Sequence, residues 1–362
     1  MMFAREQTHT SVHSKGAMLG QRQGEVCRNH FTLSAQLLYA QVVIGLSLVV
    51  YRQVSTPGYL AVVMLLPGLA VLYFLSCRLA VRVRVRKSLP GRMADLVLFA
   101  CLFLDAQMSL YAFTSVVREI LPDYNSALIC AVSLACVLPT LHKQHGHALP
   151  ALARLIKYPL LIGLGVCMLG ALPTGHTAHL FPLLGNGVGS ICQGSLWLFS
   201  ALSAALTPLY IRKPPQGLRQ KRQGFCSLAC GLLLGGATAL ISAWLLPFYF
   251  LKKPDSLGAQ LLLAVKVNPA LVSWSVMVCM MLLLLLISLA ASLSRGLHLL
   301  SHVTGRPVGW WPAVLLVPLP ALSTDAAQQI LMRLAPVRTG CMLAALLLLG
   351  IGCIGRKEEK TG

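Results

Sequence analysis

The chain has 362 residues, of which 56% are hydrophobic and 11% charged, and its mean hydropathy is +0.73. Soluble domains carry about 25% charged residues, so this chain lacks the polar side chains needed to cover its surface in water. The composition excludes a disordered tail and a small disulfide-rich secreted domain, and it argues against a soluble enzyme. It predicts a protein dissolved in a lipid bilayer.

The first 30 residues are polar and contain no apolar segment of the kind found in a cleavable signal peptide. We therefore expect a cytoplasmic N-terminal arm over 1–30, a membrane domain over 31–355 and a short cytoplasmic tail over 356–362. A helix of about 20 apolar residues crosses the hydrocarbon core. The sequence has ten apolar stretches that are candidates for such helices, near 36–51, 58–77, 93–117, 125–141, 155–173, 184–210, 224–250, 270–294, 311–330 and 338–355. This pattern predicts an all-α polytopic membrane protein with about ten transmembrane helices.

The ninth stretch is the least regular, because Pro312, Pro318 and Pro320 interrupt it and Asp325 follows. Without this crossing, the basic C-terminal tail would lie on the side of the membrane that carries few basic residues. We therefore interpret the ninth stretch as a kinked or partly broken helix that crosses.

Basic residues outnumber acidic ones by 30 to 10, which gives a formal net charge of +20. If the chain changes sides at each span, 23 of the 30 Lys and Arg lie on the side that holds both termini. This asymmetry follows the positive-inside rule and predicts a multi-pass protein with both termini in the cytoplasm. The positive charge then orients the chain in the membrane and attracts the anionic lipid headgroups of the bilayer. No role with nucleic acid is expected, because the basic residues alternate with spans and have no interleaved aromatic residues.

No motif in the sequence predicts a metal site, a cofactor or a catalytic centre. The 12 cysteines form no CxxC pair, and most lie inside spans as small packing residues. The histidines of the loop HKQHGH have no thiol or carboxylate beside them, which favours a solvated loop. Only Asp95, Asp105 and Asp325 fall within the predicted spans, and no HExxH or GxSxG frame accompanies them. The protein is therefore not expected to be an enzyme.

Asp105 lies near the middle of the third span, where an acidic side chain costs a few kcal/mol. Two interpretations account for it. Its carboxylate lines a ligand or ion site, or it bonds to a neighbouring helix or to a buried basic group. Asp95 lies near the cytoplasmic end of the same span, where we expect it to reach water.

Four glycines, Gly185, Gly187, Gly189 and Gly194, occupy the opening of the sixth span. Glycine weakens a helix and permits close approach of the backbone. The glycines therefore indicate either close helix packing or a broken helix that binds a ligand. Ten spans divide into two sets of five, which gives an inverted repeat whose first helices, one and six, are interrupted at the substrate site. In helix 1, Gly45 is the residue at which we expect such an interruption.

Four segments carry a family resemblance: TLSAQLLYAQVVIGLSLVV, LPDYNSALICAVSL, HALPALARLIKYPLLI and HLFPLLGNGVGSICQGS. Together with the order and lengths of the spans, they resemble the B subunits of bacterial endospore germinant receptors, within the amino acid, polyamine and organocation transporter superfamily. The resemblance covers roughly 31–355. Leu121-Pro122, Ala153-Arg154 and the segment from Pro182 to Gly187 match landmarks of that family.

The resemblance implies a five-plus-five inverted repeat with a small-molecule site near the bilayer midplane. Members of the family recognise germinants such as amino acids and act with an A subunit and a lipoprotein C subunit in the inner spore membrane. In such a site, we expect the ligand carboxylate at the N–H groups of the sixth helix and its ammonium near Gly45 or Asp105. The predicted ligand-binding residues are Gly45, Ser47, Asp105, Gly185, Asn186, Gly187, Gly189, Ser190 and Gly194.

The walls of this site are assigned to Met108, Trp197 and Trp274, for which simple packing is the alternative. Three functions remain open at the level of sequence. The first is a germinant-sensing receptor subunit. The second is a secondary transporter for amino acids or other small solutes in the cell membrane. It stays open because the same fold can serve either sensing or transport. The third is a membrane scaffold or an unrecognised membrane enzyme.

Overall fold

The computed structural model describes residues 27–47, 58–81, 89–141, 148–171, 175–181, 186–211, 215, 217–245, 274–309, 311–316 and 324–358. All regular structure within these ranges is helical, which confirms the all-α prediction for them. The predicted N-terminal arm lies outside the described residues up to residue 26. Residues 27–30, also assigned to that arm, instead begin the first helix.

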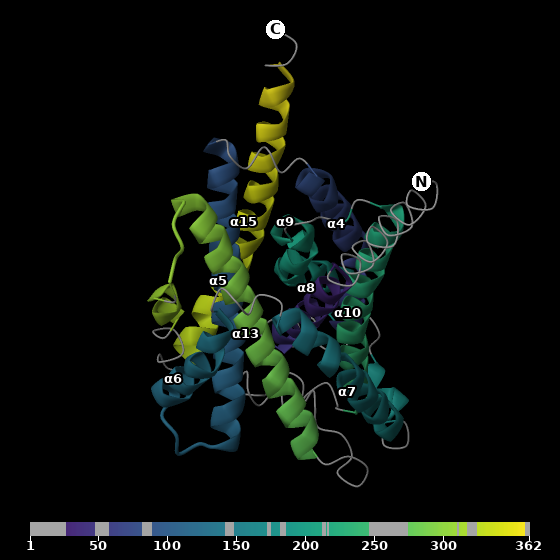
Figure 1. The fold of residues 1–362 in the computed structure, drawn as a ribbon. Helices are drawn as coiled ribbons and strands as arrows, with labels where there is room; N and C mark the ends of the chain where they lie inside the picture. Colours follow the sequence, from purple (N-terminus) through teal and green to yellow (C-terminus); the bar gives the residue numbers. More distant parts are fainter. Residues whose placement is uncertain are drawn as a thin grey trace, which may run out of the picture.

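Figure 1 shows the order of the helices along the chain. After helix 27–47 they are α3 (Gly58–Val63), α4 (Leu66–Val81), α5 (Leu89–Ile120), α6 (Ser126–Val137), η3 (Leu138–Leu141), α7 (Ala148–Ala171), η5 (Thr177–Leu180), α8 (Val188–Phe199), η6 (Ser200–Leu206), α9 (Thr207–Tyr210), α10 (Leu218–Leu245), α13 (Trp274–Thr304), η7 (Trp311–Leu316) and α15 (Thr324–Glu358). Elements labelled η are 3-10 helices.

Seven helical segments in the described ranges are long and apolar enough to cross a membrane. They are Gly58–Ala80, Leu89–Ile120, Leu149–Val166, Val188–Tyr210, Leu218–Leu245, Val278–Thr304 and Gln329–Cys353. Helix 27–47, which carries the buried polar residues Ser34, Gln36, Gln41 and Ser47, covers most of the predicted first span. The fourth span corresponds to the shorter α6. The chain is therefore a multi-pass membrane protein.

The ninth and tenth spans differ from their predicted limits. The described residues of the predicted ninth span are the 3-10 helix η7 and residues 324–330, which are part of α15. The helix α15 begins at Thr324 and so extends the tenth span by more than three turns towards its start. Pro336 lies inside α15 and does not end it. In Figure 1, α13 and α15 run in the same direction and α5 runs in the opposite one. The ninth passage stays a prediction, because residues 310 and 317–323 lie outside the described residues.

Proline explains two breaks in the helical hydrogen-bond pattern. Pro67 lies in the first turn of α4 and has no N–H to donate, which accounts for the turn that separates α3 from α4. Pro208 lies in the first turn of α9, directly after the 3-10 segment η6. The Ala204 carbonyl, which Pro208 cannot bond, accepts from the backbone N–H and the hydroxyl of Thr207.

The predicted sixth span therefore has irregular backbone in two described places, at Gly187 among its glycines and at η6 beyond them. Gly187 has a φ of 101°, a conformation that a right-handed helix excludes, and α8 begins at the next residue. Helix 27–47 ends its described part in a π-helical turn at residues 46 and 47. Short 3-10 and π segments within helices frequently mark functional sites.

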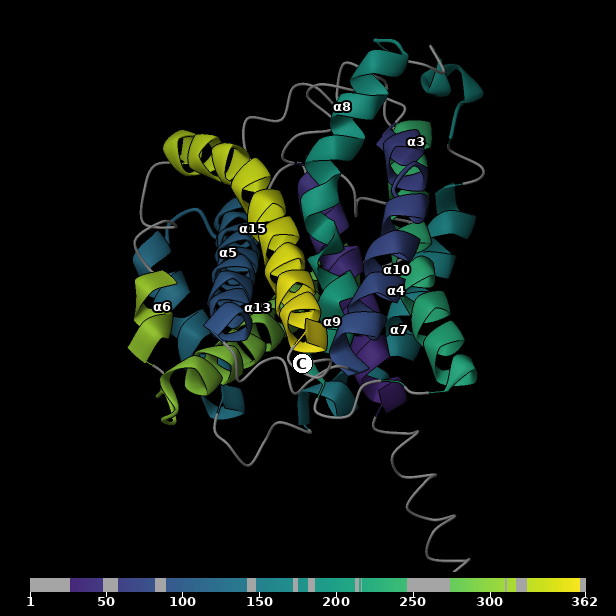
Figure 2. The same ribbon diagram turned by 90° about the horizontal axis from the view of Figure 1, so that it is seen from above.

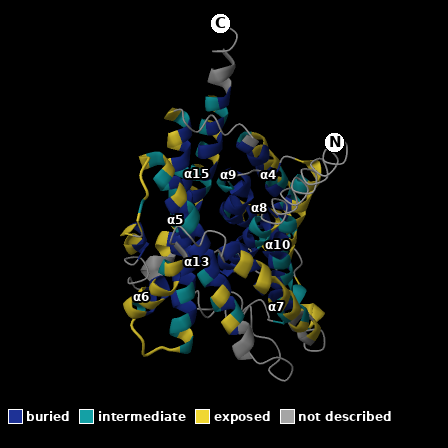
Figure 3. Cartoon of the chain, in the orientation of Figure 1, coloured by how far each residue is buried: buried dark blue, intermediate teal, exposed yellow. Residues whose placement is uncertain are grey.

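Helices five apart in span order pack against each other. α5 makes its most extensive contact with α13, the third span with the eighth, and α10 packs on α3 and α4, the seventh span on the second. The first and sixth spans meet where Gly45 faces Leu198. Figure 2 shows the helices from above, and Figure 3 shows buried residues at their centre and exposed ones on the outer faces of α6 and α7. The outer faces carry large apolar side chains, such as Leu155 and Ile162, which suit contact with lipid.

Candidate functional site: a buried polar centre

Two oppositely charged side chains meet inside the helix bundle. Asp105 lies near the middle of α5 and is 3% exposed, and Arg338 of α15 is 1% exposed. The Arg338 Nε and the Asp105 Oδ1 lie 3.0 Å apart. Removing an ion from water costs several kcal/mol, so each charge depends on the other for its stability in the interior.

The 3-10 segment η6 supplies two further partners to this ion pair. The Ser203 hydroxyl donates to Asp105 Oδ2 at 2.7 Å, whereas Oδ1 has the ion-pair contact with Arg338 and no hydrogen bond from a described residue. The Arg338 Nε donates to the Ser200 carbonyl at 2.9 Å, at the junction of α8 and η6. The irregular part of the sixth span is therefore the part that contacts the ion pair.

Helix 27–47 and α13 complete the arrangement. The Gln41 Oε1 accepts from Arg338 Nη1 at 3.1 Å, and the Gln41 Nε2 donates to Ser109 Oγ at 3.1 Å. The hydroxyls of Ser109 and Ser288 lie 2.9 Å apart. We call this set the polar centre: Gln41, Asp105, Ser109, Ser200, Ser203, Ser288 and Arg338. Its members come from the first, third, sixth, eighth and tenth spans.

The chemistry of the polar centre suits recognition rather than covalent catalysis. Its hydroxyls are hydrogen-bonded to amide, carboxylate and hydroxyl groups, and the one carboxylate among these partners, that of Asp105, is ion-paired with Arg338. The ion pair combines one carboxylate acceptor with one guanidinium donor. In a small molecule that carries both groups, the ammonium could bind Asp105 in place of Arg338, and the carboxylate could bind Arg338 in place of Asp105.

Of the predicted ligand-binding residues, Asp105 is the one that lies in the polar centre. The second interpretation of Asp105 named a buried basic group, and the structure places the buried Arg338 beside it. Gly45 lies one turn beyond Gln41, where a Cβ would come within 2.7 Å of the Leu198 side chain. Ser47 is buried, and its hydroxyl donates to the Val43 carbonyl at 3.0 Å.

The predicted glycine group lies at the opposite end of the sixth span from η6. About 20 Å of helix separates Ser190 from Ser203, so the structure does not bring this group to Asp105. The Ser190 hydroxyl donates to the Gly187 carbonyl at 2.7 Å. Asn186 and Gly189 are exposed and Gly194 is buried, whereas Gly185 lies outside the described residues.

The remaining predicted residues have separate positions. Met108 is buried, and its sulfur contacts Arg338 Nη1. Trp197 packs at the edge of a buried apolar cluster, and the side chain of Trp274 lies outside the described residues, as does that of Asp325. Asp95, expected to reach water, is instead fully buried, with its Oδ2 2.9 Å from His302 Nδ1. The contact of α5 with α13 covers it.

Arg338 was not predicted as a site residue. The predicted tenth span begins at residue 338, which places this arginine among the charges outside the membrane. The sequence does carry a signal for this role, because apolar residues lie on both sides of Arg338 and place it within a span. An arginine within a span needs an acidic partner, and Asp105 is the acid nearest the middle of a span.

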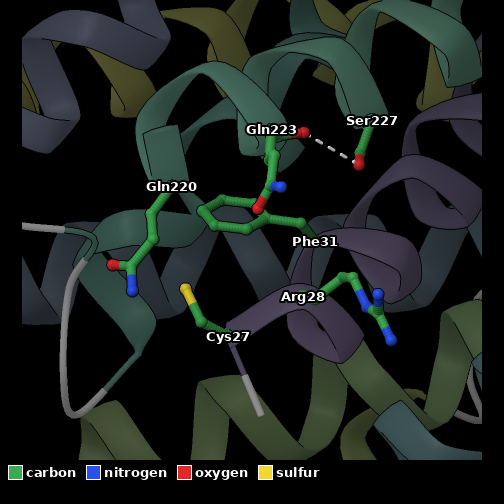
Figure 4. A pocket seen from close by; sticks show the side chains of 6 residues that line it. All are labelled: Cys27, Arg28, Phe31, Gln220, Gln223 and Ser227. Carbon is green, nitrogen blue, oxygen red and sulfur yellow. Dashed lines mark hydrogen bonds between the residues drawn. The ribbon is translucent and has the colours of Figure 1, made fainter. Parts of the chain in front are cut away.

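A pocket also opens where helix 27–47 begins, beside the start of α10 (Figure 4). It is lined by Cys27, Arg28, Phe31, Gln220, Gln223 and Ser227. Its serine is engaged locally, because the Ser227 hydroxyl donates to the Gln223 carbonyl at 3.0 Å. The pocket contains no acid, and within the described ranges no group of three His, Cys, Asp or Glu could hold a metal ion.

The sequence matches no protein-family model and no curated protein sequence. Among solved structures, the chain is similar to the manganese transporter of Eremococcus coleocola in complex with an aromatic bis-isothiourea substituted compound. The identity is 14%, the match covers 92% of this chain and 76% of that one, and the TM-score is 0.48. A mutant of the same transporter matches at 15% identity over 92% of this chain and 78% of that one, with a TM-score of 0.44. The function of the polar centre therefore has to be inferred from its own residues and their contacts.

Proposed function

We propose that the protein is a permease-type membrane protein that binds a small zwitterionic solute, such as an amino acid, at the polar centre. The observation that carries this proposal is the Asp105–Arg338 pair, held between five spans and against irregular backbone. Polar and charged groups inside a membrane domain are costly and mark substrate or ion pathways. A solute that binds between packed spans contacts several of them at once, so its binding would favour one arrangement of these spans over another.

Uptake and binding of labelled L-amino acids by the purified full chain in proteoliposomes test this proposal. We expect Asp105→Asn to reduce binding of an amino acid at least tenfold, because the ligand ammonium loses its carboxylate partner. Binding of the matching carboxylic acid without an amino group should change much less. Asp123→Asn is the matched control, since Asp123 is exposed after the end of α5. Equal losses for both ligands would reassign Asp105 to structure alone.

The resemblance of the sequence to germinant receptor B subunits extends this proposal to sensing. In that role the protein acts with an A subunit and a lipoprotein C subunit in the inner spore membrane, and the solute is a germinant. Transport predicts uptake of labelled amino acid by this chain alone. Sensing predicts that ligand response requires co-expressed partner subunits and that vesicles with this chain alone accumulate nothing.

A further inference from the structure

A second arginine lies inside the bundle and makes no ion pair with a carboxylate of the described residues. Arg295 of α13 donates from Nη2 to the Ser34 hydroxyl at 3.0 Å, and its guanidinium carbon lies 5.7 Å from the centre of the Tyr210 ring. The Ser34 hydroxyl also accepts from Thr207 Oγ1 at 2.6 Å and donates to the His30 carbonyl. Three spans therefore hold this guanidinium in one position.

This cluster forms a separate layer from the polar centre. Ser34 precedes Gln41 by seven residues, Tyr210 follows Ser203 by seven, and Arg295 follows Ser288 by seven. Seven helical residues correspond to about 10 Å. The layer lies toward the side where helix 27–47 begins and where α9 and α13 end.

The two layers together contain more positive than negative charge. A guanidinium has five N–H donors, and Arg295 makes one hydrogen bond to the described part of the chain. The carboxylate whose charge acts on it is that of Asp105, which is ion-paired with Arg338 at 3.0 Å. Two guanidiniums thus share one carboxylate within the described residues. An interior cation without a counter-charge is costly, which favours an anion beside Arg295.

We propose that Arg295 binds a single oxoanion group, a carboxylate or a phosphate, with Ser34 and Tyr210 as positioning residues. Guanidinium donors match two oxygens of such a group in a bidentate contact. The Arg295 side chain remains partly exposed, so a ligand reaches it. The exposed Arg28, on the same side, attracts anions toward it. The site is independent of the solute proposed for the polar centre.

Thermal unfolding of the full chain in nanodiscs of neutral phosphatidylcholine tests this site. Inorganic phosphate and sodium acetate are titrated at constant ionic strength against sodium chloride. A ligand that binds the folded state raises the unfolding temperature with saturable dependence on concentration. We expect a rise of several degrees for the wild type and none for Arg295→Gln. Arg306→Gln is the matched control, because it removes an exposed charge near the end of the same helix, and it should keep the full shift.

A parallel series in nanodiscs that contain phosphatidylglycerol separates the two sources of the oxoanion. Stabilisation by phosphate or acetate in neutral discs identifies a free anion, and stabilisation by the anionic lipid alone identifies a headgroup. Ser34→Ala keeps the charge and should weaken the response several-fold, which provides a readout should Arg295→Gln fail to fold. The proposal is overturned if no anion or anionic lipid stabilises the wild type, or if Arg295→Gln or Ser34→Ala responds like the wild type.

Discussion

Asp105 and Arg338 are buried away from water and form an ion pair. The groups around them determine how much this pair contributes to the stability of the protein. The carboxylate has Arg338 on one oxygen and Ser203 on the other, and the guanidinium reaches Ser200 and Gln41. A buried pair is often no more stable than apolar residues of the same size, whereas one buried charge without its partner is strongly destabilising. The pair is therefore better explained by recognition than by stability.

This asymmetry gives a prediction for the pair. Asp105→Asn leaves Arg338 charged and unbalanced, and we expect it to lower the free energy of unfolding by about 3–5 kcal/mol. The double variant Asp105→Leu/Arg338→Met should regain most of this loss, because no unpaired charge remains. Unfolding in detergent, compared across the double-mutant cycle, measures the coupling. A double variant as unstable as Asp105→Asn would contradict the ion pair.

Cys27 permits a test of burial outside the membrane-spanning region. It precedes the predicted first span, and burial together with the nearby Cys77 thiol raises its pKa to about 11. The thiolate is the reactive form, so at neutral pH Cys27 should react slowly with a maleimide. In chains that keep one cysteine each, we expect at least tenfold slower labelling at Cys27 than at the exposed Cys226.

The pH dependence provides the control for this experiment. Raising the pH toward 11 should increase labelling of Cys27 steeply, because the folded state favours the neutral thiol until the pH approaches its raised pKa. The same pKa shift contributes stability at neutral pH, which is lost as the pH rises from the ordinary cysteine value to about 11. Fast labelling of Cys27 at pH 7 would show that the thiol is not buried.

At the level of elements, the sequence predicted most of the helices and less of their irregularities. Apolar length identified the spans, because a bilayer imposes that length on every helix that crosses it. The break in the sixth span was assigned to the glycines, whereas the 3-10 segment precedes Pro208, whose missing N–H changes the hydrogen-bond pattern upstream. Arg338 was missed because its partner lies on a helix that is distant in sequence.

Several glycines of α10 lie close to helix 27–47, and Gly231 is the one that meets its backbone. A Cβ at Gly231 would overlap the Ala35 carbonyl oxygen and lie 3.0 Å from its carbon, and backbone cannot move aside cheaply. We expect Gly231→Ala to lower the free energy of unfolding by about 1–3 kcal/mol. At Gly236, on the same helix, the nearest atom to a Cβ would be Val62 Cγ1 at 3.4 Å, an ordinary contact.

Gly236→Ala is therefore the matched control, and it should leave stability unchanged or raise it slightly, since alanine favours a helix. Both variants are compared by thermal unfolding in the same detergent. Equal effects of the two alanines would mean that helix 27–47 and α10 do not approach as closely as the structure places them.

For the whole molecule, contacts between spans one and six, two and seven, and three and eight are those that a five-plus-five inverted repeat predicts. The polar centre lies where the first, third, sixth and eighth spans converge on the tenth. Residue-level similarity between the halves is not detectable in the sequence, because membrane-facing positions constrain hydrophobicity more than identity. The repeat therefore rests on span number and on contacts.

The direction of the last span gives the final prediction. Because α13 and α15 run the same way, the C-terminus lies on the same side as the end of α13, provided that residues 305–323 cross back. The basic residues put that side in the cytoplasm. A fluorescent protein fused after residue 360 should therefore fluoresce, and alkaline phosphatase fused after residue 253 should be active outside. A fusion after residue 222, at the start of α10, is the cytoplasmic control. An active phosphatase after residue 360 would mean that the ninth passage does not cross, and the count of spans, and with it the division into two sets of five, would be wrong.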